Sequence, residues 1–252
     1  MRAWRRISLS MGLVLVSASA VPVGAPAATE TACSAVAGTA GISGPTHAVA
    51  WRAGIDASTA IFSLPGKSMH ITRWLTPADA AWVLVIGRSR AADGRCWVQV
   101  RLPWRPNGSA GWINANKIAL EQTPWRIEVS TSRRTLTLFR AGTVVRTVSV
   151  VVGKPSTPTP DGLFAVWWAI PWHPEDFLGS WVLDLTAHSD ALQQFDGGDG
   201  TVAIHGRGGA SLQDPLGTAN SHGCIRLSND TIDRLVQMIG PSRLPGTPVQ
   251  IS

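Results

Sequence analysis

The sequence predicts a mainly β fold with one short helix near its C-terminal end. From residue 47 onward, short apolar runs of alternating polarity are separated by Gly, Pro, Asn and Asp, the pattern of strands joined by tight turns. A helical period is clear in one segment, residues 228–240. The composition, 44% hydrophobic and 15% charged over 252 residues, is that of a globular chain of one or two domains.

Residues 1–28 have the composition of a signal peptide. Three arginines among the first six residues precede an apolar stretch, and small residues at 18–20 or 25–27 provide A-x-A cleavage sites. The apolar stretch is shorter than the ~20 residues that a membrane-spanning helix needs, so we expect cleavage rather than an uncleaved anchor. The expected location is therefore the periplasm or the cell wall.

The charge of the chain excludes one class of partner. Of the formal net charge of +6, three positive charges lie in the signal peptide, which leaves +3 for the remainder. No cluster of Lys and Arg follows residue 6, so we expect no binding to nucleic acid. The small excess suits a wall or membrane surface that is rich in phosphate and carboxylate.

Export would place the three cysteines in an oxidising compartment. We expect a Cys33–Cys96 disulfide, which leaves Cys224 as a free thiol. Two alternatives stay open: Cys33 could lie unpaired in a terminal tail, or it could carry a lipid anchor, although residues 30–32 make a poor lipidation signal.

The first folded region is expected over residues 47–120, after a linker at 29–46 that is rich in Ala, Gly, Pro and Thr. Strands are predicted at 82–87 and 96–102, with turns at 91–94 and 106–108.

Short strands at this spacing are typical of a small β-barrel. The region resembles bacterial Src-homology-3-like domains, whose last strands often combine an aromatic-x-x-Val segment with a following Gly-Trp, here Gly111-Trp112. That resemblance implies binding of wall peptides or positioning of the enzyme; a purely structural spacer is the alternative.

The second folded region is expected over residues 124–252. Three alternating runs lie between 125 and 153, with Ala141-Gly142 as a hairpin turn and Gly153 closing the third strand. Further strands are predicted within 157–170, at "TVAIHG" (201–206) and at "TPVQIS" (247–252).

The predicted helix begins after the Cys224 segment. Ser228 or Asn229 can cap its N-terminus, and Gly240-Pro241 ends it. Its apolar face consists of Ile232, Leu235, Val236 and Ile239.

The segment "IHGRGGASLQDPLGTANSHGCIRL" (204–227) holds two histidines, a cysteine and an arginine. Side chains two residues apart share a face of an extended chain, so His222, Cys224 and Arg226 would line one side of a cleft, with His205 coming from a neighbouring strand. A thiol is only a few per cent ionised at pH 7, so a catalytic cysteine needs a base nearby, which either histidine could supply. Gly223 permits a tight turn and leaves backbone N–H groups open to a developing oxyanion.

Two other interpretations of Cys224 are an inert buried thiol and a zinc ligand. Only three candidate ligands stand in this segment, which is too few for a structural zinc site. Sortases and papain-like peptidases differ in the order or spacing of Cys, His and Arg. We therefore expect a nucleophile with its base.

These motifs resemble the active-site signature of the L,D-transpeptidase catalytic domain family, which is YkuD-like. The matching residues are His205-Gly206, Leu216-Gly217 and the run Ser221–Leu227. Upstream, residues 135–166 are similar to the family's opening strands with its Thr-Pro-x-Gly-x-Phe segment, and "LTAHS" (185–189) is similar to a stretch of actinobacterial members. The resemblance covers residues 124–252.

The resemblance implies a secreted transferase of peptidoglycan biosynthesis that contributes to cell-wall organization and cell shape and needs no cofactor and no metal. Its cysteine would attack the stem tetrapeptide before the terminal D-Ala and pass the acyl group to an amine of a second stem, linking two position-three diamino acids. Carbapenems would trap the thiol. An L,D-carboxypeptidase of the same fold, or an inactive wall-binding module, are the alternatives.

The family's roles carry over to named positions of this chain. Cys224 would be the nucleophile and His205 the general acid/base. The residues implied to shape the site or bind substrate are His222, Arg226, Ser221, Gly223, Arg207 and His188. Ser221 and Gly223 would frame the oxyanion pocket through backbone groups.

The chain departs from the family pattern at Arg207, where many members have Thr or Ser after His-Gly. This arginine would add positive potential for a carboxylate-bearing donor. Trp167, Trp168 and Trp172 are candidates for aromatic contacts with substrate, and packing in the core is the alternative for each.

Overall fold

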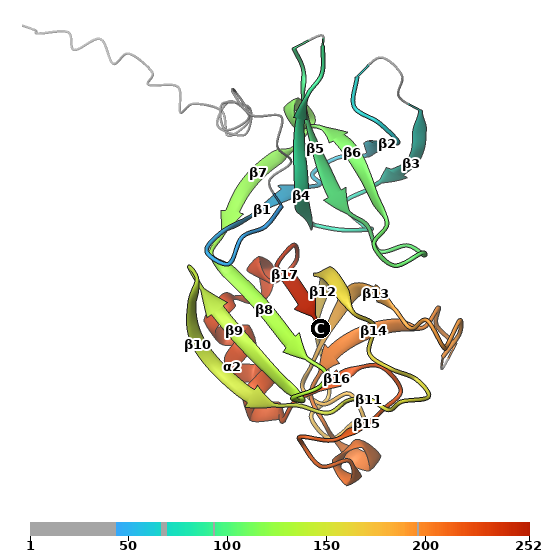
Figure 1. Cartoon of the computed structure of the whole chain (residues 1–252), viewed down its shortest axis with the longest axis vertical. Coiled ribbons are helices and arrows are strands. Elements are labelled where there is room, and N and C mark those ends of the chain that lie inside the picture. Colours follow the sequence, from blue (N-terminus) through green and yellow to red (C-terminus); the bar gives the residue numbers. More distant parts are fainter. Residues whose placement is uncertain (1–43, 67–69, 93, 196) are drawn as a thin grey trace, which may run out of the picture.

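The structure is a computed structural model that describes residues 44–66, 70–92, 94–195 and 197–252. The expected signal peptide, most of the linker and Cys33 lie outside the described residues. Two large sheets follow one another along the chain, with Pro124 between the last strand of the first and the opening strand of the second (Figure 1). The mainly β fold predicted from the sequence is confirmed.

The first sheet has seven antiparallel strands in the order β3-β2-β6-β5-β4-β1-β7. Their bounds are β1 Ala50–Gly54, β2 Thr59–Phe62, β3 Ile71–Leu75, β4 Trp82–Arg90, β5 Cys96–Arg101, β6 Ala110–Asn114 and β7 Ala119–Thr123, with a short 3₁₀ helix, η1, at Ala115–Lys117. The two predicted strands are β4 and β5, and Ser109 N donates to Pro106 O in the predicted second turn. The resemblance to Src-homology-3-like domains stays a prediction.

Cys96 opens β5 and is disulfide-bonded. Its predicted partner, Cys33, lies outside the described residues, so the pairing itself stays a prediction. Cys224 is a free cysteine, as expected.

The second sheet has eight strands in the order β10-β9-β8-β17-β12-β13-β14-β16. Their bounds are β8 Trp125–Ser130, β9 Thr135–Arg140, β10 Thr143–Ser149, β12 Gly162–Pro171, β13 Trp181–His188, β14 Thr201–His205, β16 Ile225–Arg226 and β17 Pro248–Ile251. Two of its pairs are parallel, β8 with β17 and β14 with β16.

The third predicted run of this region was placed wrongly at its end. β10 stops at Ser149, and Val152–Gly153 form a separate strand, β11, that pairs in parallel with β15 (Ala219–Ser221). The reason is burial: Val150 and Val151 are fully buried, and Val151 bridges to Arg226, so the chain leaves the exposed edge strand and turns into the core.

In the described part of the chain the one α-helix is α2, Asn229–Ile239, which agrees with the predicted helix. Ser228 stands at the N-cap position, and Gly240 ends the helix with φ +91°. The four residues predicted for its apolar face are all buried in the core of the second sheet. Short 3₁₀ helices, η2 and η3, occupy Gly209–Gln213 and Pro241–Arg243.

The two regions share a packed boundary. Trp167 of β12 is 8% exposed and belongs to the hydrophobic core of the first sheet, where it joins residues such as Val85, Val98 and Ile113. Trp168 packs, partly buried, against the same cluster. For these two tryptophans the core alternative therefore holds. No helix among the described residues has the length and apolar character to cross a membrane.

Candidate active site

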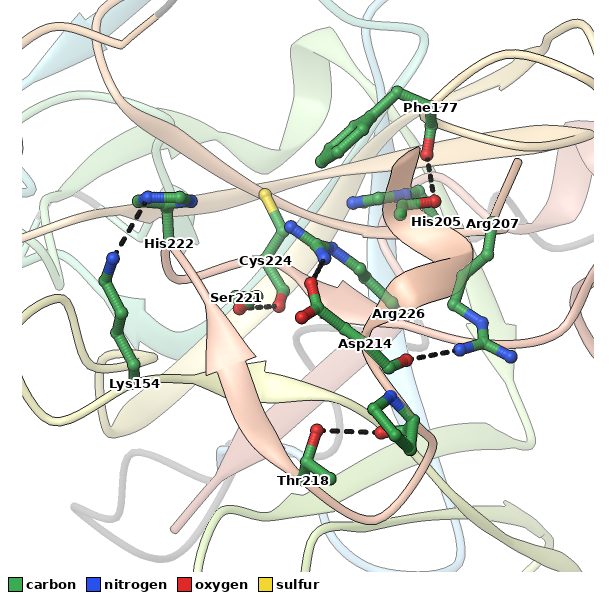
Figure 2. A network of polar contacts seen from close by, with 12 residues as sticks. Lys154, Phe177, His205, Arg207, Asp214, Thr218, Ser221, His222, Cys224 and Arg226 are labelled. Atoms are coloured by element: carbon green, nitrogen blue, oxygen red, sulfur yellow. Dashed lines mark hydrogen bonds and ion pairs between the residues drawn. The ribbon is translucent and has the colours of Figure 1, made fainter. Parts of the chain in front are cut away.

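The site is built on one face of β13, β14 and β16. In the parallel pair, Ile204 is the register partner of Ile225 and His205 that of Arg226. Because side chains alternate along a strand, His205 and Arg226 lie on one face and the two isoleucines on the other. Cys224, two residues before Arg226, lines the same cleft (Figure 2).

This face borders a cleft of about 610 Å³. Among the sequence-predicted residues the cleft brings together His205, His222, Cys224 and Arg226. Trp172 also lines it and is 44% exposed, so the aromatic-contact interpretation remains for this tryptophan.

A tight turn presents Cys224. Ser221, fully buried, donates from Oγ to Cys224 O at 2.6 Å and accepts from Gly223 N at 3.1 Å. Thr159 Oγ1 donates to Gly223 O at 2.8 Å. Gly223 has φ +126°, a conformation that favours glycine.

This turn corrects two expectations. The chain is not extended from His222 to Arg226, so His222 reaches the cleft across the turn, while Cys224 and Arg226 share the strand face. The N–H of Gly223 is already bonded to Ser221, which argues against the expected role of that N–H at an oxyanion.

His205 is 1% exposed, and its Nδ1 lies 2.7 Å from Gly206 O. A carbonyl can only accept, so Nδ1 carries the proton and Nε2 keeps its lone pair in the neutral ring. Burial, reinforced by the positive charge of Arg226, lowers the pKa of His205 to about 4, although backbone hydrogen bonds with Gly206 and Leu178 oppose the shift. His205 is therefore a neutral base at pH 7.

Cys224 is half-buried. Burial raises the pKa of its thiol, and the nearby Asp184 carboxylate acts in the same direction. A hydrogen bond with the Ala203 backbone and the charge of Arg226 act against this rise. The resting pair is thus a neutral thiol and a neutral imidazole rather than a thiolate and an imidazolium.

Arg226 is held from two sides. It is 3% exposed; its Nη1 donates to Asp214 Oδ2 at 2.5 Å, and its guanidinium lies 4.7 Å from the centre of the Phe177 ring (Figure 2). Arg207 donates from Nη1 to Asp214 O at 2.5 Å. Asp214 thus orients both arginines, a role that sequence reasoning missed because nothing in its own segment marks it.

His222 lies at the rim of the cleft and is exposed. Its Nε2 is 3.2 Å from Lys154 Nζ, and its ring stacks on Phe195 with centroids 5.4 Å apart. Partial burial, then the charges of Lys154 and Arg226, lower the pKa of His222. Lys154 and Phe195 were not predicted as site residues.

Asn229 explains the glycine that follows His205. Its Oδ1 accepts from Ser180 N at 3.2 Å and from Arg207 N at 3.0 Å, and its Nδ2 donates to Pro174 O at 2.9 Å. A Cβ at Gly206 would lie 2.2 Å from that Oδ1, so only glycine fits there. The sequence indicated Asn229 only as a candidate helix cap.

His188 is not among the residues that line the cleft. It is 1% exposed, and its Nε2 lies 3.0 Å from Asp199 Oδ2. The described residues include no group of three or more His, Cys, Asp or Glu that could hold a metal ion.

Comparison with known proteins gives a consistent picture. The family model described as the L,D-transpeptidase catalytic domain, YkuD, matches residues 124–251. A Bacillus licheniformis protein that carries the name L,D-transpeptidase YkuD is 31% identical over 158 residues, which cover 60% of this chain and 86% of the relative.

Two solved structures give weaker likenesses. The L,D-transpeptidase of Enterococcus faecium is 24% identical with a TM-score of 0.37, covering 51% of this chain and 49% of that one. An L,D-transpeptidase from Mycobacterium smegmatis is 17% identical with a TM-score of 0.38, covering 63% and 90%. This chain thus spans about half the length of the Enterococcus chain.

Proposed function

Because this chain belongs to the L,D-transpeptidase catalytic domain family, we propose that it is a peptidoglycan transpeptidase in which Cys224 is the nucleophile and His205 the general acid/base. The observation that carries the proposal is the cleft that holds both groups, one a free thiol and the other a neutral imidazole with its Nε2 lone pair available.

In the first half-reaction, Nε2 of His205 takes the proton of Cys224 while Sγ attacks the carbonyl carbon of the third stem residue. The new S–C bond forms, the C–N bond to the terminal D-Ala breaks, and the proton passes from His205 to the departing amine. The product is a thioester on Cys224 and free D-Ala.

In the second half-reaction, the amine of a second stem peptide attacks the thioester. His205 accepts a proton from that amine and returns it to Sγ as the S–C bond breaks, which leaves a cross-link between two position-three residues. If water takes the place of the amine, the same residues perform the carboxypeptidase reaction.

Positive charge around the cleft suits a donor that carries carboxylates. Arg226 stands beside the reacting pair, and Lys154 stands at the rim beside His222. For the developing oxyanion, the backbone N–H of Cys224 is our candidate donor, since that of Gly223 is bonded to Ser221.

We also propose that the enzyme is exported to the periplasm or cell wall after cleavage of the N-terminal signal peptide. The disulfide bond of Cys96 supports an oxidising compartment. For the first sheet we propose a role in binding wall peptides or positioning the enzyme, because its sequence resembles Src-homology-3-like domains.

The test is to incubate the chain lacking residues 1–28 with a purified tetrapeptide-containing dimer and to determine the product masses. Transpeptidation predicts a cross-linked product lighter than the sum of two donors by one D-Ala. A product that has lost D-Ala and gained the elements of water would identify the carboxypeptidase. Unchanged substrate would contradict both and favour a wall-binding module.

A further inference from the structure

One wall of the cleft is the loop between β13 and β14, which we call the cleft wall and define as residues 189–195 and 197–200. Ser189, Leu192, Phe195 and Gly200 of this wall line the cleft. The base of the loop is closed by Ser189 N, which donates to Gly200 O at 2.8 Å. Above that base, Phe195 stacks on His222 at the rim.

An arginine of the first region holds the outer side of this wall. Arg105 Nη1 donates to Ser189 O at 3.0 Å, and Nη2 donates to Leu192 O at 3.0 Å and to Asp199 O at 2.8 Å. These three carbonyls come from both arms of the loop. A single planar guanidinium therefore ties the two arms together from outside the catalytic region.

The glycine at position 200 leaves room for the Arg105 guanidinium against the cleft wall. Gly200 has φ +74°, and a Cβ there would lie 2.2 Å from Leu192 O and 3.0 Å from Arg105 Nη2. A larger residue at 200 would push the arginine and the wall apart.

Asn107, in the turn that follows Arg105, adds a second contact. Its Oδ1 accepts from His188 N at 2.8 Å, and its Nδ2 donates to His188 O at 2.7 Å and to Asp190 Oδ1 at 3.1 Å. The side-chain amide thus pairs with the backbone at the start of the wall as a neighbouring strand would. Both ends of the wall are fixed by one turn of the first region.

A second arginine of the first region makes the same kind of contact at a different place. Arg52 donates from Nη1 to the carbonyls of Ser242, Arg243 and Pro245 at 3.1–3.3 Å. Those carbonyls follow α2 and do not line the cleft. Arg52 is therefore a matched control: it joins the two regions without touching the wall.

We propose that Arg105, supported by Asn107, is a positioning residue for the donor peptide: the first region sets the place of the cleft wall and thereby the shape of the cleft over Cys224. The inference rests on the proposed function, in which this cleft takes the stem peptide. Arg105 acts through the wall and not on the reacting atoms. Its loss should raise KM for the peptide and leave the intrinsic reactivity of the thiol unchanged.

The experiment compares Arg105→Ala and Arg105→Lys with Arg52→Ala in the full chain without its signal peptide. We expect Arg105→Ala to lower kcat/KM for the tetrapeptide about 10- to 100-fold, mainly through KM, as a misplaced binding wall does. Lysine, a single point donor, should rescue little of it. Arg52→Ala should stay within about twofold of wild type at a temperature where all variants are folded.

Two further measurements separate positioning from general damage. Alkylation of Cys224 by iodoacetamide should proceed at the wild-type rate in all three variants. Hydrogen exchange should show faster exchange of amides in the cleft wall for Arg105→Ala but not for Arg52→Ala. Equal losses in Arg105→Ala and Arg52→Ala, or unchanged wall exchange and KM in Arg105→Ala, would overturn the inference. An inactive wild type would contradict the proposed function, while the exchange result would still decide whether Arg105 holds the wall.

Discussion

The two faces of the β14–β16 pair have opposite characters, although adjacent residues of the same two strands form them. On the core face, Ile204 and Ile225 are fully buried among apolar side chains. On the cleft face, one position along each strand, His205 and Arg226 line the cleft. A shift of one residue in register would exchange the two sets, so correct pairing of these short strands is a condition for activity.

Burial has different consequences on the two faces. Burial of Ile204 and Ile225 favours folding. Burial of His205 beside Arg226 disfavours its charged form and lowers its pKa to about 4. The core face should therefore govern stability and the cleft face the reaction, and the following changes test that division.

The largest effect is expected for Cys224→Ala on the cleft face. Removing the proposed nucleophile should abolish formation of cross-linked product, because no other thiol lines the cleft in the described part of the chain. The melting temperature should stay close to that of wild type. Both are measured on the same preparation, and product above the background of an enzyme-free sample would contradict covalent catalysis by this residue.

The second change removes the proposed base, His205. His205→Ala should slow acylation by about 10²- to 10⁴-fold, the usual contribution of a general acid/base. Stopped-flow or quenched measurements of acylation give this rate directly. His222→Ala is the matched control at the cleft rim and should cost less; a greater loss in His222→Ala than in His205→Ala would reverse the assignment.

On the core face, Ile225→Ala should destabilise the fold by about 2–5 kcal/mol, because it leaves a cavity in a fully buried cluster. Denaturant unfolding measures this loss. Activity per folded molecule should change little compared with the cleft-face variants. If activity fell by as much as in His205→Ala while stability stayed constant, the division between the two faces would be wrong.

A comparable effect on stability, confined to acidic pH, is expected from His205. His205 titrates near 4 in the folded chain, below the ordinary 6.5, so the acid limb of acylation should lie near 4. Between these values the unfolded chain binds a proton at His205 that the folded chain does not, so His205 should lower the free energy of unfolding by about 3 kcal/mol as pH drops from 6.5 to 4. In His205→Gln this dependence should be absent from unfolding curves. In wild type, an acid limb of acylation at 6.5 would contradict the lowered pKa of His205.

The parts of the fold that the sequence predicted are those with a local pattern. The strands β4, β5 and β14 follow from alternation and turns, and α2 follows from its four apolar positions and its terminal glycine. The end of β10 was missed because Val150–Val152 is an apolar run directly after the strand, and periodicity does not distinguish a strand from a chain that turns into the core.

The candidate site was predictable where its residues belong to a recognisable sequence motif. Cys224, His222 and Arg226 stand two positions apart, and His205 precedes a glycine. The contacts of Asp214 with Arg226 and of Arg105 with the cleft wall were not predictable, because no local sequence period marks them. The position of His222 was misjudged because Gly223 takes a positive φ and breaks the extended chain.

The central claim, that the Cys224 thiol is the atom that becomes acylated, is tested most directly by intact-protein mass spectrometry after incubation with a carbapenem. Opening of the strained lactam by the thiol adds the whole mass of the compound and releases nothing. We predict one adduct per chain, absent after prior alkylation of Cys224 and absent in Cys224→Ala. No adduct on active enzyme, or an adduct of the same extent on Cys224→Ala, would contradict the account.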